Sequence, residues 1–271
     1  MERLRIATVG DNCIDRYLAP VGLSTVGGNA VNVAVQLTRL GQDVAYFGAV
    51  GDDAEGRRLL ACLRENGLRT EPVRTAAGRT AYTDIGSDPS GDRIMLFEEF
   101  GVCRGYRPDA PEIEILSRMR HVHIGWLADG GELKRTLTAA GVGVSQDLSV
   151  NAVAENVRPE GLSIAFASAE GSRRRGEALL EQLLVAGARV AVVTCGADGS
   201  MASDGTHRAE ADVAPAALID TLGAGDTFIA GFIAAHLQGR SLAACLEMGR
   251  DAAAVTCTQL GGFPQTPVPT A

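Results

Sequence analysis

The order of apolar and polar positions predicts strands and helices that alternate along most of the chain. Short apolar runs predict buried strands at residues 4–10, 44–50, 121–125, 142–147, 163–167 and 189–194. Apolar residues at helical spacing predict helices near 29–40, 55–66, 131–140, 173–187, 224–238 and 241–258. Gly41 and Gly67 stand where a glycine commonly ends a helix. Such alternation is typical of a mostly parallel sheet with helices on both faces.

One part of the chain breaks this alternation. Residues 80–85 and 93–97 predict two short strands, joined by the turn residues Ser87–Gly91. A hairpin inserted into a parallel α/β fold is most simply a lid over the site or a flap used in oligomerisation. We therefore expect a single α/β domain, residues 1–271, with a small β lid formed by about 12–26 and 72–100.

The composition fits an α/β domain and disfavours several kinds of partner. With 271 residues, 46% of them hydrophobic, the chain can bury a full core. It has no apolar run of about 18 residues, the length that would predict a membrane span, and its first residues lack the apolar region of a secretory signal. The formal net charge of −8 disfavours nucleic acids and anionic membranes as partners. The six cysteines form no C-x-x-C pair, which is typical of reduced thiols and predicts a cytoplasmic protein.

Lys134 is the only lysine in the chain, and this excludes several enzyme classes. It is followed by Arg135 and not by the Ser or Thr that ends a P-loop. A P-loop nucleotidase, a eukaryotic-type protein kinase and a Schiff-base enzyme each need a lysine in a defined context. The first predicted strand is also not followed by a G-x-G-x-x-G motif, so dinucleotide binding has no support.

Residues 219–232 carry the clearest chemistry of the sequence. Gly223, Ala224 and Gly225 stand where a predicted helix begins, and the free N–H groups of a helix start bind anions. Asp226 follows in the first turn, beside this anion site. An anion site next to a carboxylate suits phosphoryl transfer, in which the carboxylate takes the proton of a hydroxyl group. From this stretch alone, an Asp that only caps the helix is an equally good interpretation.

Other polar residues follow predicted strands at the edge of the sheet where ligands bind. Asp11 and Asp15 come after the first strand, and Asp147 ends a later one. Asn29 and Asn32 lie about one turn apart on the next predicted helix and can face one ligand. A solvated loop acid is the alternative interpretation of Asp15.

Two stretches about 190 residues apart resemble the signatures of the PfkB (ribokinase-like) carbohydrate kinases. The N-terminal signature has its counterparts in Gly27–Gly28, Asn32–Ala34, Gly41 and Gly51. The C-terminal signature is matched by Asp220–Asp226 and Ala230–Phe232. The resemblance implies a ribokinase-like three-layer α/β/α sandwich with a mostly parallel central sheet and a small β lid. It also implies an ATP-dependent carbohydrate kinase that uses Mg²⁺.

The resemblance implies a role for each matched residue. Asp226 would be the general base, with the anion hole formed by the backbone of Gly223, Ala224 and Gly225. The sugar would contact Asp11, Asp15, Gly27, Gly28, Asn29, Asn32 and Arg93. ATP would contact Ser168, Thr194, Gly196, Asp198, Gly199, Gly225 and Asp251. A monovalent cation such as K⁺ could bind backbone carbonyl groups near Asp220 and Leu222.

The sequence departs from the family pattern at one place that concerns magnesium. Where relatives have Asn-x-x-Glu, this chain has Ser168-Ala169-Glu170-Gly171, so Glu170 is a weaker candidate for ordering Mg²⁺. Serine at this position is usual in the fructoselysine 6-kinases, which the segments 10–15, 27–35 and 166–169 also resemble.

These resemblances favour phosphorylation of the primary (6-) hydroxyl group of a fructosamine such as fructoselysine. Asn29 replaces a lysine of the ribokinases, which makes ribose a less probable substrate. The alternatives are a ribose, fructose or nucleoside kinase of the same family and a catalytically silent sugar-binding protein. The 4% aromatic content weakens the nucleoside option, because bases stack on aromatic rings. The lid is also a candidate homodimer interface.

Overall fold

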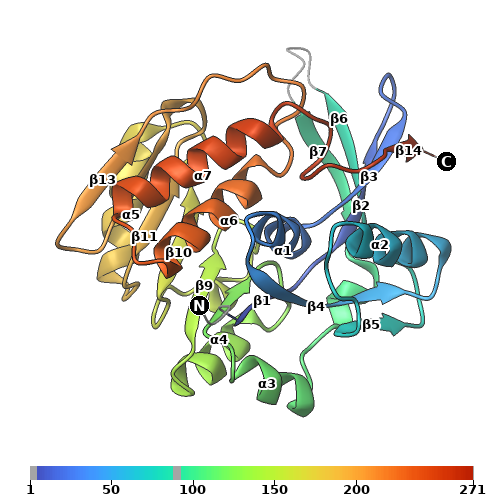
Figure 1. Ribbon diagram of the computed structural model, residues 1–271, viewed down its shortest axis with the longest axis horizontal. Helices are drawn as coiled ribbons and strands as arrows, with labels where there is room; N and C mark the ends of the chain where they lie inside the picture. The colour runs from blue at the N-terminus through green and yellow to red at the C-terminus, as the bar shows by residue number, and fades with distance from the viewer. Residues whose placement is uncertain (1–4, 88–92, 271) are drawn as a thin grey trace.

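The computed structural model describes residues 5–87 and 93–270, which form two β-sheets and the helices around them (Figure 1). Apart from Ser87, the turn predicted at 87–91 lies outside the described residues. Within the described part of the chain, no helix combines the length and the apolar character needed to cross a bilayer.

The larger sheet has nine strands in the order β13-β12-β11-β10-β9-β8-β1-β4-β5. Their bounds are β1 Arg5–Val9, β4 Asp43–Gly51, β5 Val73–Ala76, β8 His121–Ile124, β9 Gly143–Asp147, β10 Ile164–Ser168, β11 Ala191–Thr194, β12 Ser200–Ser203 and β13 Arg208–Ala211. The strands from β11 to β5 are parallel, and the hairpin β12–β13 adds two antiparallel strands at one edge.

Helices cover both faces of this sheet. They are α1 Asn29–Arg39, α2 Ala54–Glu65, α3 Ala110–Leu116, α4 Gly130–Ala139, α5 Arg173–Val185, α6 Ala224–Leu237 and α7 Leu242–Thr256, with short 3₁₀ turns at Gly101–Gly105, Ala154–Asn156 and Gly196–Asp198. Successive residues of β1 face opposite sides: Ile6 packs with α1, α2, α6 and α7, whereas Ala7 packs with α3, α4 and α5. The three-layer α/β/α architecture predicted from the sequence is confirmed.

A second, five-stranded sheet lies beside the larger one and has the order β14-β3-β2-β6-β7 (Figure 1). Its strands are β2 Cys13–Tyr17, β3 Leu23–Gly27, β6 Tyr82–Ser87, β7 Arg93–Glu99 and β14 Val268–Pro269. We call it the lid sheet. Three separate parts of the chain therefore meet in it, and the last part is the C-terminal strand, which the sequence did not predict.

Two further elements were not predicted. Strand β5 has only four residues, of which Arg74 and Thr75 are polar, so it lacks an apolar run. Helix α3 has seven residues, but it begins with a capping box between Asp109 and Glu112 and has Pro111 in its first turn. The D-x-x-E spacing with proline was therefore a signal that could have revealed α3.

Candidate active site

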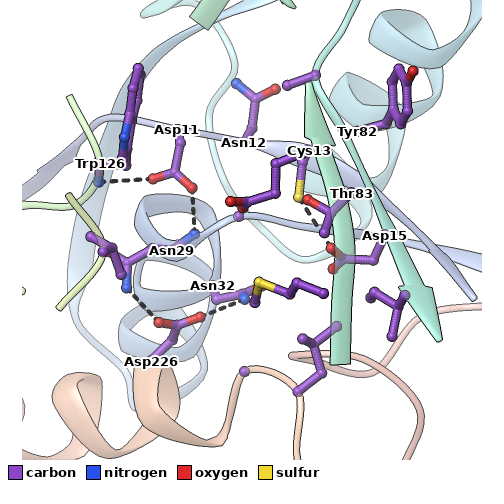
Figure 2. Close-up of a pocket in the computed structure, with 18 of the residues that line it drawn as sticks. Asp11, Asn12, Cys13, Asp15, Asn29, Asn32, Tyr82, Thr83, Trp126 and Asp226 are labelled. Atoms are coloured by element: carbon purple, nitrogen blue, oxygen red, sulfur yellow. Dashed lines mark hydrogen bonds between the residues drawn. The ribbon is translucent and has the colours of Figure 1, made fainter. Parts of the chain in front are cut away.

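A cavity of about 320 Å³ lies between the carboxyl-terminal edge of the large sheet and the lid sheet (Figure 2). Residues of both sheets and of the α6 start line it. The large-sheet side contributes Asp11, Gly28, Asn29, Asn32, Trp126, Thr221, Leu222, Gly223, Gly225 and Asp226. The lid side contributes Cys13, Asp15, Tyr82, Thr83, Arg93, Glu98 and Glu99. Most residues predicted to bind the sugar thus line one cavity with Asp226.

The turn before α6 has the geometry of an anion site. Gly223 has φ +74°, and a Cβ there would lie 2.4 Å from Gly262 Cα, so only glycine fits. The Ala224 N–H group donates to the Thr221 carbonyl group, which leaves the N–H groups of Gly225 and Asp226 at the open helix start. A Cβ on Gly225 would meet no atom within 4 Å, so an anion has room to approach.

Asp226 is held by two asparagine side chains of α1. Asn29 Nδ2 donates to Asp226 Oδ1 at 2.5 Å, and Asn32 Nδ2 donates to Oδ2 at 2.7 Å (Figure 2). Burial raises the pKa of Asp226 to about 7; Asp147 and Asp11 raise it as well, while the two asparagines lower it. A carboxylate with a pKa near neutrality is suited to accept a proton at physiological pH.

Asp11 and Asp15 lie on opposite sides of the cavity and differ in their partners. Asp11 accepts hydrogen bonds from the backbone N–H groups of Asn29, Ala30 and Trp126, so it also fixes the start of α1. Asp15, on β2, accepts only from Cys13 Sγ at 3.2 Å among the bonds described for it. Burial raises the pKa of Asp11 to about 6 and that of Asp15 to about 7.

Gly27 lies just behind this lining. A Cβ at Gly27 would lie 1.9 Å from Asp15 Oδ2, so the glycine leaves the space that this carboxylate occupies. Its contribution to the site is therefore room for Asp15.

The sequence analysis missed the three aromatic residues that line the cavity, Tyr82, Phe100 and Trp126. The rings of Phe100 and Trp126 stack with their centroids 3.9 Å apart, and both line the cavity. Trp126 lies two residues beyond β8, at the same sheet edge as Asp11. The rule that ligands bind beyond the carboxyl ends of parallel strands could have identified it.

Asp220 connects the lid sheet to the loop before the turn Gly223–Gly225, which we call the anion turn. Its carboxylate accepts hydrogen bonds from Tyr17 Oη at 2.5 Å, Gly261 N at 3.0 Å and Leu222 N at 3.2 Å. Arg93 Nε, on lid strand β7, lies 3.6 Å from Asp220 Oδ1. Protein groups therefore already bind both oxygens of Asp220, and a K⁺ ion here would depend on backbone carbonyl groups.

The residues predicted to bind ATP lie at the neighbouring strand ends. Ser168 and Thr194 are paired in register at the ends of β10 and β11. The 3₁₀ turn Gly196–Asp198 is separated from the end of β11 by one residue, and Gly199 ends it. Of the residues predicted to bind ATP, Gly225 alone also lines the cavity described above.

Glu170 and Asp251, two of the acidic residues of this region, are exposed and paired with arginines. Glu170 pairs with Arg175, and Asp251 pairs with Arg250 at 2.8 Å. Within residues 5–87 and 93–270, no cluster of three or more His, Cys, Asp or Glu side chains could hold a metal ion. This donor set fits Mg²⁺ only as a partner of ATP, because Mg²⁺ commonly takes few protein ligands beside phosphates and water.

Comparison with known proteins agrees with this geometry. The model of the pfkB family carbohydrate kinases matches residues 16–102 and 160–270. The chain is 32% identical to the fructoselysine 6-kinase of Escherichia coli strain K12 over 261 residues, covering 95% of this chain and 99% of that protein. It is 30% identical to a fructosamine kinase of Bacillus subtilis over 265 residues, covering 96% and 93%.

Among solved structures, the fold is similar to a ribokinase of Arabidopsis thaliana complexed with ribose and ATP. The TM-score is 0.84 at 21% identity, covering 96% of this chain and 94% of the other. This likeness shows the ribokinase-like fold, and the sequence matches show the family. The chain therefore belongs to the pfkB family of carbohydrate kinases and is an ATP-dependent carbohydrate kinase.

Proposed function

We propose that this kinase transfers the γ-phosphoryl group of ATP to the primary (6-) hydroxyl group of a fructosamine such as fructoselysine. The observation that carries the proposal is the charge pattern of the cavity. Asp15 and Glu98 lie close enough for the charge of Glu98 to act on Asp15, and Arg93 lines the same cavity. The relatives named fructoselysine 6-kinase and fructosamine kinase support the same substrate class.

The charges of a fructosamine complement those of the cavity. The amine is bound to the first carbon of the sugar and is positively charged, which suits Asp15 and Glu98. The amino-acid carboxylate lies further from the ring, where the guanidinium group of Arg93 can bind it. Each charge-assisted hydrogen bond of this kind contributes about 1.5–3 kcal/mol. Free fructose lacks both charges and would lose these contacts.

In this proposal, Asp226, the start of α6 and the ATP site each have a role in phosphoryl transfer. Asp226 accepts the proton of the 6-hydroxyl group while the sugar oxygen bonds to the γ-phosphorus and the bond to ADP breaks. The N–H groups at the start of α6 stabilise the negative charge on the transferred group. Ser168 and Glu170 are the residues that would hold Mg²⁺ on the ATP phosphates, where bound Mg²⁺ neutralises charge. Asn29 and Asn32 keep the Asp226 carboxylate aimed at the cavity.

The alternative substrates are ribose, fructose and nucleosides. The stacked pair of Phe100 and Trp126 is an observation that favours a nucleoside, because a base can stack on an aromatic ring. ADP release over a panel of fructoselysine, fructose, ribose and adenosine decides between them. We expect the kcat/KM of fructoselysine to be at least about tenfold higher than that of fructose, ribose or adenosine. One or two charge-assisted contacts are enough for a difference of this size. Equal efficiency on fructose, or a preference for a nucleoside, would contradict the fructosamine proposal but not the kinase activity.

The lid sheet also suits a homodimer. Strand β7 is an edge strand, and Met95, Leu96 and Phe97 on it are 62%, 55% and 50% exposed. An exposed apolar edge commonly pairs with another chain. Light scattering of the wild type and of Leu96→Glu tests this proposal: a dimer that becomes a monomer supports it, and a wild-type monomer contradicts it.

Two further proposals concern conditions in the cell. All six cysteines are free thiols, five of them buried, which supports a reducing compartment such as the cytoplasm.

A K⁺ ion at the backbone carbonyl groups of Asp220 and Leu222 would stabilise the anion turn. Replacing KCl with choline chloride at constant ionic strength tests it: slower turnover in choline supports a K⁺ site, and unchanged turnover contradicts it.

A further inference from the structure

Asp147 is a buried carboxylate close to the catalytic centre that the mechanism above does not use. It ends β9, is 6% exposed and stands behind the residues that line the cavity. Its Oδ1 accepts hydrogen bonds from Ser149 N at 2.9 Å and from Ser149 Oγ at 2.5 Å. Across the described ranges of the chain, no basic side chain forms an ion pair with Asp147. A buried carboxylate without a cation is costly, so its position needs an explanation.

The remaining partner of Asp147 is the asparagine that holds the catalytic base. Asn29 Nδ2 donates to Asp147 Oδ2 at 3.0 Å and to Asp226 Oδ1 at 2.5 Å. A side-chain amide has two N–H hydrogens, so Asn29 gives one to each carboxylate. Its oxygen, Oδ1, is buried without a hydrogen-bond partner and lies against Gly125.

This arrangement leaves only one favourable orientation of the Asn29 amide. If the amide turned over, its oxygen would face the carboxylates of both Asp226 and Asp147, and both hydrogen bonds would be lost. With Asp226 as the only acceptor, the reversal would cost one hydrogen bond and not two. Asp147 therefore makes the orientation that serves Asp226 much more favourable than the reverse.

We propose that Asp147 is a positioning residue for phosphoryl transfer, which acts through Asn29 to keep the Asp226 carboxylate aligned with the hydroxyl group of the substrate. The groups that face Asp226 are Asn29 and Asn32, which donate to it, and Asp147 and Asp11, whose charges act on it. Asp147 also raises the pKa of Asp226, which keeps the base near neutrality. This inference rests on the proposed role of Asp226 as the base.

A double-mutant cycle between positions 147 and 29 tests the proposal, because two residues that act together are not additive. We expect Asp147→Asn to lower kcat at least about tenfold, with little change in the KM for either substrate, since one misaligned contact can cost this much. In the Asn29→Ala background, the same substitution should lower kcat less than about twofold, because the amide through which Asp147 acts is absent. Asp129→Asn is the matched control. It is the same substitution in a partly buried aspartate, paired with Arg107 and not with Asn29.

Two results would overturn the proposal. One is a kcat for Asp147→Asn within twofold of the wild type. The other is an equal loss in both backgrounds, which is the expectation for a residue that only supports the fold. If Asp147→Asn does not fold, as judged by thermal unfolding, Ser149→Ala takes its place. It frees Asp147 Oδ1 from the hydroxyl group, and it should lower kcat in the wild-type background but not with Asn29→Ala.

The cycle can be measured with whichever sugar the wild type phosphorylates. A wrong substrate assignment therefore does not affect the outcome. The role of Asp226 as the base is tested separately by Asp226→Asn.

Discussion

Arg93 Nε lies 3.6 Å from Asp220 Oδ1, and this contact joins the edge strand of the lid sheet to the loop that precedes the anion turn. The Tyr17 hydroxyl group of β2 donates to the other oxygen of the same carboxylate. The lid sheet therefore contacts the loop before α6 and also lines the cavity. Arg93 thus lines the cavity and also contacts the loop that precedes α6.

Arg93→Ala should narrow the preference for fructoselysine over fructose. The substitution removes the guanidinium group that we expect to bind the substrate carboxylate. This contact should contribute about 10- to 100-fold to kcat/KM. Contact with Asp220 is lost for both substrates, so the ratio of their kcat/KM values isolates the effect on the carboxylate. Arg16→Ala is the matched control, because Arg16 is a lid arginine paired with a lid aspartate, Asp84, at 2.6 Å. An unchanged ratio in Arg93→Ala would show that Arg93 does not bind the substrate.

Asp226→Asn should lower kcat by about 10²–10⁴-fold while the fold is retained, because the amide cannot accept the proton. ATP affinity should stay nearly constant, since the predicted nucleotide contacts at Ser168 and Thr194 lie on other elements. Steady-state kinetics, together with nucleotide binding by calorimetry, measure both effects. Turnover above about a third of the wild-type rate would rule out Asp226 as the general base.

Gly225→Val should abolish phosphate transfer without unfolding the protein. The valine side chain would enter the open space at the start of α6, where the anion must approach. Gly105→Val is a matched control, because a Cβ there also meets no atom within 4 Å and Gly105 does not line the cavity. Circular dichroism should be native for both variants. Normal activity in Gly225→Val would place the anion site elsewhere.

Activity should rise with pH through the region near neutrality. Asp226 must be ionised to accept a proton, and its pKa is raised to about 7, mainly by burial. The acid limb of the profile of kcat/KM against pH should therefore have its midpoint near pH 7, because kcat/KM reports the pKa of the essential groups in the free enzyme. An acid limb with a midpoint near the ordinary value for aspartate, about 4, would contradict this.

Asp15→Asn should make the protein more resistant to heat at pH 8. The pKa of Asp15 is about 7 in the folded chain, above the ordinary value of 3.8, so folding favours the protonated form. The stability that this group contributes is complete below the unfolded pKa and is lost as the pH rises through the folded pKa. Asparagine mimics the protonated form, so the gain in melting temperature should be present at pH 8 and absent at pH 4. A gain of equal size at both values would mean that ionisation of Asp15 is not its cause.

Apart from β5, the sequence predicted the strands at the centre of the large sheet and the helices that follow them, because apolar runs and glycine caps are local signals. Asn29 and Asn32, which the sequence analysis expected to face one ligand, line the same cavity. Their contacts with Asp226 join residues 197 and 194 positions apart, and helical spacing carries no information about such pairs. The family signatures, and not the periodicity, supplied the reason to place them together.

The details that were missed depend on tertiary contacts. Strand β14 has two residues and exists because Val268 and Pro269 pair with β3, next to Gln265, whose side chain bonds the backbone of Val26. A two-residue strand has no pattern of its own. The hydrogen bond between Asp147 and Asn29 is likewise not predicted by the sequence pattern, in which Asp147 is only one of several acidic residues at a strand end.

The lid sheet is assembled from β2–β3, β6–β7 and β14, which lie near the beginning, at about one third and at the end of the chain. Specificity could be changed by replacing one contiguous lid segment with that of a relative. Such a replacement would bring in only some of the strands, and these would not match the neighbouring strands of this chain. Chimaeras that exchange residues 93–99 alone would keep Asp15 and the C-terminal strand of this chain. New specificities on this scaffold are accessible mainly through point substitutions on the cavity side of the strands, and a library should be built that way.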